Sequence, residues 1–199
     1  MDCKIIGIAG GSGSGKTTLC KKLASLWGDK CVVISSDDYY RPAKEFSLEA
    51  RANQNFDHPD SLELDLLAEH LRQLRAGNDV EVPRYCFKSH DRLEEVHGVS
   101  PHDIVFVEGV LIFVDPGLRE AMDLRVFVDA DDVVRFRRRM DRDVAQRQRT
   151  ATSVKEQWDA TVAPMYAEFV EPTKKYAHLV VNTNDFNPFL EEWLSGAMR

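Results

Sequence analysis

The sequence predicts an α/β fold in which a parallel sheet is flanked by helices, built as a single domain over residues 1–199. Short apolar runs of strand type alternate with helical patterns along the chain, which is typical of a parallel sheet. The runs at 103–110 and 124–130 are almost continuously apolar, as expected for strands covered on both faces. No internal repeat and no linker rich in Pro, Gly or Ser divides the chain.

The strands are predicted from their apolar and β-branched residues. The sheet is expected to contain the segments 4–10, 31–35, 103–110, 124–130 and 178–182. Segments 80–87 and 94–100 are expected to pair with each other as a small β-hairpin insertion over 80–100, attached to the sheet.

The helices are predicted from apolar residues that recur with a helical period. A first helix is expected over 16–27, directly after the first strand. Asp60 with Glu63 has the spacing of a capping box and is expected to begin a second helix. Ser153 with Glu156 is expected to begin a later helix in the same way.

Charge and composition exclude several function classes. The formal net charge is −7, which argues against a general nucleic-acid binder, since such proteins display a basic surface. No apolar run approaches the ~20 residues that a membrane helix needs. The N-terminus enters a strand directly, without the pattern of a signal peptide, and the four cysteines lack CxxC spacing. We therefore expect a cytoplasmic protein with reduced thiols and without a membrane partner.

The stretch "GGSGSGKTT" at 10–18 matches the phosphate-binding loop G-x-x-x-x-G-K-[ST] and lies between a predicted strand and a predicted helix. Its backbone N–H groups can converge on phosphate oxygens, and the helix N-terminus adds a positive end. Lys16 is expected to reach the β- and γ-phosphates, and Thr17 to ligate Mg²⁺. The predicted ATP-binding residues are Gly10, Gly11, Ser12, Gly13, Ser14, Gly15, Lys16, Thr17 and Thr18.

This loop predicts a P-loop NTPase fold without fixing the activity. The base-reading N-K-x-D of GTPases is absent from the sequence, and motor or transporter ATPases are usually longer. A compact chain of 199 residues instead favours a small phosphotransferase.

A nucleotide site of this kind also needs a second Walker element, which is a carboxylate at the end of a strand, and two strands end in one. Glu108 and Asp129 each follow an apolar run and could orient a magnesium-bound water. Glu108 is favoured because Gly109 leaves room for close approach at the carboxyl end of the strand. Asp129 is then expected to be a residue at the start of a helix.

Transfer of a phosphoryl group to an alcohol needs a carboxylate that receives or orients the hydroxyl proton. "SSDDYY" at 35–40 places Asp37 and Asp38 just past the second strand, at the edge where such sheets bind ligands. From spacing alone, a loop cap is as good an interpretation of these residues as catalysis.

Seven of the chain's sixteen arginines lie within residues 135–149. On a helix, Phe136, Met140 and Val144 would form the buried edge of this segment. Guanidinium groups that close over a triphosphate match the charge of a phosphoryl-transfer transition state. The alternative is a solvated helix whose arginines pair with neighbouring aspartates, and we expect about half of them to do so.

Several motifs, in order and spacing, resemble the uridine kinase (uridine–cytidine kinase) family over nearly the whole chain. They are "GGSGSGKTT", "SSDDYY", "NFDHPDSLELDLL", "VPRYCFKSH", "IVFVEGVLIF", "LRVFVDAD" and "FVEPTKKYAHLVV". The resemblance implies a fold like that of nucleoside monophosphate kinases. It also implies transfer of the γ-phosphate of ATP, with Mg²⁺, to the 5′-hydroxyl of uridine or cytidine.

The resemblance also implies roles for individual residues. Asp37 would be the general base on the 5′-hydroxyl, and Asp57 would hold the ribose hydroxyls. Tyr85 and Phe87 would wall the base pocket, and His90 would meet the polar edge of the base. Residues matching nucleoside contacts of the family are Arg139, Arg149 and Gln157. Residues 135–152 resemble the lid of such kinases, with Arg142 and Arg147 directed toward phosphate as catalytic residues.

The sequence departs from the family pattern at two places. The family usually has Arg-Gly-Arg at the end of the lid, whereas this chain has Gln148 between Arg147 and Arg149, which should stiffen or reshape the hinge. After the last strand, at 182–186, a Pro-Arg-Gly stretch is replaced by "NTNDF", so no adenine-contacting residue is assigned. A final helix is expected to open at Asn187.

Other functions remain open from the sequence. The same scaffold could phosphorylate another small alcohol, such as nicotinamide riboside, pantothenate or ribulose phosphate, or act as a nucleotide-binding regulator without transfer activity. A nucleic-acid partner is not expected. The resemblance implies a homo-oligomer, commonly a tetramer, to which the hairpin contributes contacts.

Overall fold

A five-stranded parallel sheet forms the centre of the protein, whose computed structural model describes residues 3–52 and 54–182. The strand order is β2-β5-β1-β6-β7, and every neighbouring pair is parallel. The strands are β1 (Lys4–Ala9), β2 (Cys31–Ser35), β5 (Ile104–Gly109), β6 (Leu124–Asp129) and β7 (Leu179–Asn182). The predicted sheet is confirmed, with ends that differ from the expected ones by one residue or less.

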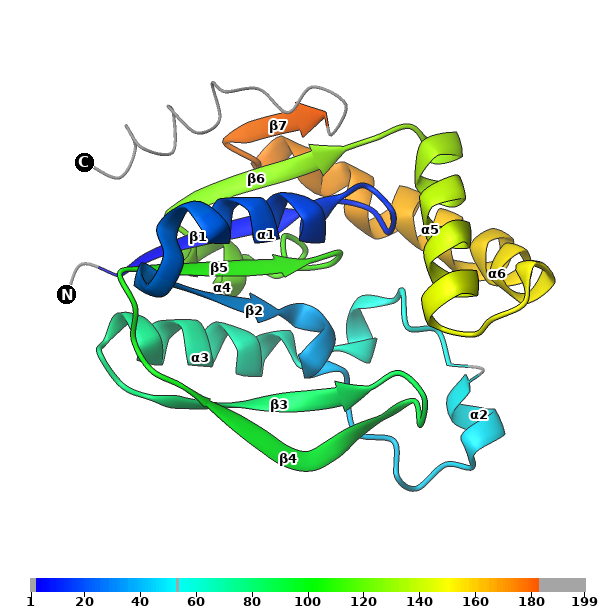
Figure 1. Cartoon of the computed structure of the whole chain (residues 1–199), viewed down its shortest axis with the longest axis horizontal. Coiled ribbons are helices and arrows are strands. Elements are labelled where there is room, and N and C mark those ends of the chain that lie inside the picture. The colour runs from blue at the N-terminus through cyan, green and yellow to red at the C-terminus, as the bar shows by residue number, and fades with distance from the viewer. Residues whose placement is uncertain (1–2, 53, 183–199) are drawn as a thin grey trace.

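Helices cover both faces of this sheet. On one face, α1 (Lys16–Trp27) packs Leu19 and Leu23 against β1, β5 and β6. On the other face lie α3 (Leu64–Arg75) and α4 (Pro116–Ala121), which contact each other and close a larger apolar core. In Figure 1, α1 lies in front of the sheet and α4 behind it. The predicted first helix is confirmed at both ends.

A separate two-stranded antiparallel sheet confirms the predicted hairpin. It pairs β3 (Val80–Cys86) with β4 (Asp91–Val99), and α3 lies between it and the main sheet (Figure 1). A short helix, α2 (Leu48–Ala52), and 3₁₀ turns at Ser36–Tyr39 and Pro59–Ser61 belong to the loops beside the hairpin.

The chain between β6 and β7 is almost entirely helical. It contains α5 (Asp132–Gln146), α6 (Ala151–Gln157), α7 (Ala163–Met165), two π-helical segments at Trp158–Val162 and Tyr166–Val170, and a 3₁₀ segment at Glu171–Tyr176. The arrowheads of β5 and β6 point toward the side of the molecule where α5 and α6 stand (Figure 1). This segment therefore lies beyond the carboxyl ends of the strands, where parallel sheets bind ligands.

Both predicted capping boxes are wrong. Helix α3 begins at Leu64 after Glu63, because Asp60 belongs to a preceding 3₁₀ turn in which the side chain of His58 accepts the Asp60 N–H. Helix α6 begins two residues before Ser153, and the side chain of Thr150 accepts the Ser153 N–H. Thr150 thus caps α6 in place of Ser153, whereas α3 begins without a side-chain cap. The helix expected from Asn187 lies outside the described residues.

The predicted buried edge of the arginine-rich helix is also wrong. In α5 the buried residues are Arg135, Arg139 and Asp143, while Val144 is exposed and Met140 only partly covered. The helix faces a polar cavity instead of the apolar core, so its charged side is the one that is covered.

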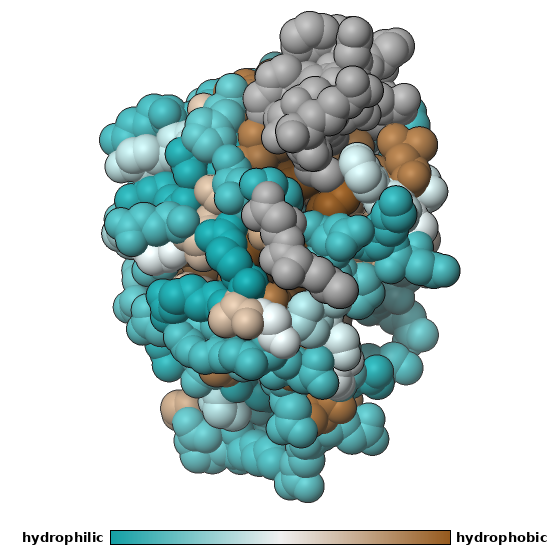
Figure 2. All heavy atoms as spheres, turned by 90° about the vertical axis from the view of Figure 1, so that its left-hand side faces the viewer, coloured by the Kyte–Doolittle hydropathy of each residue, from teal (hydrophilic) through white to brown (hydrophobic). Residues whose placement is uncertain are grey.

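The end of the molecule opposite α5 and α6 has a mostly polar surface. Hydrophilic side chains dominate the described part of the face in Figure 2, with apolar side chains in smaller groups. Among the described residues, none of the helices has the length and apolar character needed to cross a bilayer.

Candidate active site

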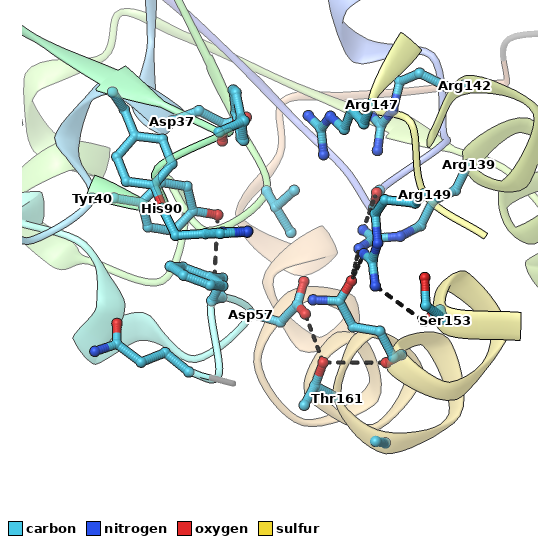
Figure 3. A pocket seen from close by; sticks show the side chains of 18 of the residues that line it. Asp37, Tyr40, Asp57, His90, Arg139, Arg142, Arg147, Arg149, Ser153 and Thr161 are labelled. Atoms are coloured by element: carbon cyan, nitrogen blue, oxygen red, sulfur yellow. Dashed lines mark hydrogen bonds between the residues drawn. The ribbon is translucent and has the colours of Figure 1, made fainter. Parts of the chain in front are cut away.

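A cavity of about 550 Å³ opens at the carboxyl ends of the strands, between the phosphate loop, the hairpin and α5–α6. In Figure 3, Asp37, Tyr40 and His90 stand on one side of it and the lid arginines on the other. The predicted site residues that line it are Ser12, Lys16, Thr17, Asp37, Asp57, Tyr85, Phe87, His90, Glu108, Arg139, Arg142, Arg147, Arg149 and Gln157. Thr18 is exposed and does not belong to its lining.

The phosphate loop connects β1 to α1 and has little room for side chains. Gly13 has a φ of 79°, and a Cβ there would lie 2.2 Å from the carbonyl oxygen of Arg135. Lys16 is buried in the loop, where its Nζ donates to the Gly11 carbonyl at 3.3 Å. Burial lowers the pKa of Lys16, while the carboxylates of Glu108 and Asp37 act in the opposite direction. The loop thus presents backbone groups and one ammonium to the cavity.

Glu108 lies directly against the start of α1. The Thr17 hydroxyl donates to Glu108 Oε1 at 3.0 Å. In the sheet, Glu108 of β5 is paired with Ile8 of β1 on one side and with Ser35 of β2 on the other. This register fixes Glu108 near the carboxyl ends of the strands. Burial raises the pKa of Glu108, and the Lys16 ammonium opposes that shift. A hydroxyl and a carboxylate side by side offer the oxygen ligands that Mg²⁺ prefers.

Asp129, the alternative carboxylate, has another partner. It ends β6 and pairs with Lys174 Nζ at 3.0 Å. It does not begin the following helix as expected, because α5 starts at Asp132. The geometry therefore favours Glu108 as the neighbour of the phosphate loop.

The two neighbouring aspartates after β2 have different surroundings. Asp37 lines the cavity from the 3₁₀ turn, where its N–H is bonded to Ser35 Oγ at 3.3 Å. Asp38 instead accepts the backbone N–H of Tyr85 at 3.2 Å, which ties the turn to the hairpin. Burial raises the pKa of Asp38. Of the two, only Asp37 is placed to meet a ligand.

Arg139 bridges the phosphate loop and α6. Its Nη1 donates to Ser12 Oγ at 2.8 Å, and its Nη2 donates to Gln157 Oε1 at 2.9 Å. Burial lowers the pKa of Arg139, and the nearby carboxylates of Asp57 and Asp143 offset only part of that shift. Arg149 also donates to Gln157 Oε1, so that two guanidinium groups share one amide oxygen. Figure 3 shows these contacts on the side of the cavity opposite Asp37.

Asp143 is the common partner of three arginines. It is completely buried, and its carboxylate lies 2.8 Å from Arg142 Nε, 3.5 Å from Arg139 Nε and 3.6 Å from Arg147 Nη1. Arg147 also places its guanidinium 4.2 Å from the ring centroid of Phe87, on the hairpin. These contacts bring Arg142 and Arg147 to the cavity. Other lid arginines have partners elsewhere, such as Arg135, which pairs with Asp132.

Asp57 lies at the bottom of the cavity in Figure 3. Its Oδ2 accepts a hydrogen bond of 2.9 Å from the hydroxyl of Thr161. Burial raises the pKa of Asp57, and the Arg139 guanidinium, followed by the Thr161 hydroxyl, opposes that shift. This carboxylate therefore has one hydroxyl donor and the positive charge of Arg139 near it, and it lines the cavity.

Aromatic rings form the remaining wall. Tyr85 contacts Phe87 with ring centroids 5.2 Å apart, and Tyr40 with centroids 4.8 Å apart. Phe56 stacks on His90, with an interplanar angle of 25°. Burial lowers the pKa of His90, and the nearby lid arginines act in the same direction, which favours the neutral imidazole. A neutral imidazole offers one donor and one acceptor to a ligand.

Several lining residues were missed by the sequence reasoning. Tyr40 and Phe56 stand directly beside the predicted carboxylates, in "SSDDYY" and "NFDHP", so the motif spacing contained a signal for them. Thr161 had no such signal, because it becomes part of the site through Asp57, a partner distant in sequence.

The comparisons with known proteins agree with this geometry. Residues 5–187 match the model of the phosphoribulokinase / uridine kinase family. The chain belongs to this family. Among its relatives, the uridine kinase of Halalkalibacterium halodurans is 46% identical over 178 residues, which cover 89% of this chain and 84% of that protein. The uridine kinase of Chloroflexus aurantiacus is 45% identical over 185 residues, 92% of this chain and 88% of the relative.

Solved structures of the phosphoribulokinase / uridine kinase family and of other kinases share the fold. Phosphoribulokinase from Rhodobacter spheroides superposes with a TM-score of 0.65 at 17% identity, covering 95% of this chain and 74% of that one. The D-glycerate 3-kinase of Cryptococcus neoformans gives a TM-score of 0.66 at 20% identity, over 86% and 80% of the two chains. At such identities the likeness concerns the fold alone.

Proposed function

We propose that this protein is a uridine/cytidine kinase, which transfers the γ-phosphate of ATP to the 5′-hydroxyl of the nucleoside to give UMP or CMP. One observation carries the proposal: Asp37 lines a single cavity with Lys16 of the phosphate loop on one side and with Asp57 and the aromatic wall on the other. The named relatives favour uridine over nicotinamide riboside, pantothenate or ribulose phosphate as the acceptor, and favour an enzyme over a regulator.

The donor side is built for a polyphosphate. The phosphate loop offers backbone N–H groups, Lys16 meets the terminal phosphates, and Arg142 and Arg147 approach from the lid. Because Asp143 already fixes these arginines, their charge is in place before the transferred group becomes planar and its charge spreads over three oxygens. We therefore expect the two arginines to stabilise the transition state more than bound ATP.

Thr17 and Glu108 would hold Mg²⁺, since together they present a hydroxyl and a carboxylate oxygen beside the phosphate loop. When bound, the ion neutralises phosphate charge during transfer. No group of three or more His, Cys, Asp or Glu in the described residues could hold a metal. This agrees with an ion that takes most of its remaining ligands from phosphate and water.

The acceptor side is built for a ribose and a flat polar base. Asp57 would accept hydrogen bonds from the ribose hydroxyls, with Arg139, Arg149 and Gln157 on the opposite side of the sugar. Tyr85 and Phe87 would stack on or border the pyrimidine. The lowered pKa of His90 favours its neutral form, which would serve as donor or acceptor at the position where uracil and cytosine differ. In this arrangement the 5′-hydroxyl faces Asp37, which takes its proton as the new P–O bond forms.

The catalytic proposal is tested with Asp37→Asn. Loss of the general base is expected to lower kcat for uridine by about 10²–10⁴-fold, with little change in the KM for ATP. Asp38→Asn is a matched control, because an asparagine still offers an oxygen to the Tyr85 N–H; its kcat should change by less than about tenfold. Unchanged turnover in Asp37→Asn, or no phosphorylation of uridine and cytidine by the unaltered enzyme, contradicts the proposal.

Assembly and location are part of the same proposal. Leu93 and Val96 of β4 are exposed apolar residues on the hairpin, which agrees with hairpin contacts in a homotetramer. We place the enzyme in the cytoplasm, where ATP is available and thiols stay reduced. Light scattering of the pure protein tests the tetramer directly.

A further inference from the structure

We propose that Thr161 is a positioning residue for the acceptor, whose hydroxyl orients the Asp57 carboxylate and holds it in the ionised form that receives the ribose hydroxyls. This inference rests on the proposed function, because it takes Asp57 as the group that holds the sugar. It assigns a role in nucleoside binding to an uncharged residue that belongs to none of the sequence motifs described above.

The contact joins two distant parts of the chain at the cavity wall. Thr161 lies in the π-helical segment Trp158–Val162, and its hydroxyl reaches Asp57 across 104 residues of sequence. Both residues line the cavity, and the bond between them is drawn in Figure 3. π-Helical turns interrupt a regular helix at an energetic cost and are frequent at functional sites. Here the turn carries the residue that touches the carboxylate.

The Thr161 hydroxyl has one proton and two acceptors within reach. These are Asp57 Oδ2 at 2.9 Å and the carbonyl oxygen of Gln157 at 3.2 Å. A hydrogen bond to a charged acceptor is the stronger one, so the proton is directed to the ionised carboxylate. One Asp57 oxygen is then anchored by the helix. The remaining lone pairs of the carboxylate stay available for hydroxyl donors of a ligand.

The charges around Asp57 make this bond important. Burial favours the neutral acid, and Asp37, from the turn after β2, acts in the same direction. The groups that oppose them are the guanidinium charges of Arg139 and Arg149 and the Thr161 hydroxyl. The phenol of Tyr40 also lies near Asp57, and it donates to the Phe56 carbonyl. Thr161 is the uncharged donor in direct contact with the carboxylate. Its removal takes the hydroxyl donor away from a partly buried carboxylate oxygen, which raises the pKa of Asp57 further.

The test compares Thr161→Val, which keeps the shape of the side chain, with Thr161→Ser, which keeps the hydroxyl. In Thr161→Val the KM for uridine is expected to rise about tenfold or more, with the KM for ATP and kcat little changed. Because the ionised carboxylate binds the sugar, uridine binding weakens as pH falls through the pKa of Asp57. That loss should begin at a higher pH in Thr161→Val. Thr161→Ser should behave like the unaltered enzyme in both respects.

The outcomes separate this inference from the proposed function. If the unaltered enzyme does not bind or phosphorylate uridine, the proposed function fails. If it does, and Thr161→Val keeps the same uridine KM and pH profile, Thr161 has no positioning role. Equal impairment of the Ser and Val variants also overturns the inference, since packing and not the hydroxyl would then matter. Uridine binding measured by calorimetry without ATP gives a readout independent of turnover.

Discussion

Gln148 has a backbone conformation that normally belongs to glycine. Its φ is 55°, in the left-handed region, where a side chain is strained. The resemblance places a glycine at this position, between the two arginines that end the lid. The substitution therefore kept the turn and added strain, which a glycine would avoid.

Gln148→Gly is expected to stabilise the protein by about 0.5–1 kcal/mol. Relief of the left-handed strain contributes about 1–2 kcal/mol, and the greater freedom of glycine in the unfolded chain offsets part of it. Urea unfolding measures the difference. Gln148→Ala is the matched control, because it removes the same exposed side chain but keeps the Cβ that causes the strain. Equal stability of the two variants would show that Gln148 is not strained.

At the level of single residues, the sequence predicted those that belong to a contiguous motif. Lys16 and Thr17 could be placed because a phosphate loop fixes their surroundings within a few positions, whereas Asp37 was singled out from Asp38 only by the family resemblance. Thr161 could not be placed, because its importance comes from a contact with Asp57 that only the folded chain creates. Its local sequence, "WDATVAP", has no feature that distinguishes it from an ordinary helix.

Helix α5 shows where pattern reasoning fails for a whole element. The usual assumption is that the apolar side of a helix is buried against a core. In α5 the buried positions are charged, since the helix lines a cavity shared with the phosphate loop and Asp143 pairs with its arginines in place of an apolar contact. Strands β1, β5 and β6 were predicted well for the opposite reason: they are almost completely buried, and near-continuous apolar runs are typical of strands covered on both faces.

Asp143→Asn is expected to loosen the lid segment. Without the carboxylate, Arg139, Arg142 and Arg147 repel one another around a buried neutral amide. We expect a loss of about 3 kcal/mol in the free energy of unfolding and a marked rise in the KM for ATP. Asp141→Asn, on the exposed side of the same helix, should change stability by no more than about 0.5 kcal/mol. Similar behaviour of both variants in urea unfolding and kinetics would refute the role of Asp143.

For the molecule as a whole, the site is assembled from two parts that meet at Arg139. The phosphate loop belongs to the central sheet, while Gln157 and Thr161 belong to the helical segment beyond its edge. The bond from Arg139 Nη1 to Ser12 Oγ joins the two. A ligand that orders the phosphate loop therefore also orders Arg139, and a ligand that orders Arg139 also orders Ser12 of the loop. This predicts that ATP and the nucleoside strengthen each other's binding.

Ser12→Ala should weaken this mutual effect. We expect the unaltered protein to bind uridine more tightly when a non-hydrolysable ATP analogue is present. In the variant, the factor by which the analogue increases uridine affinity should be about fivefold smaller. Calorimetry in both orders of addition provides an internal check, because the two ligands must change each other's affinity by the same factor. Ser14→Ala is the matched control: Ser14 Oγ is buried in the same loop and has no hydrogen-bond partner among the described residues. Unequal factors would indicate a faulty measurement, whereas an undiminished enhancement in Ser12→Ala would mean that the two parts communicate through other contacts.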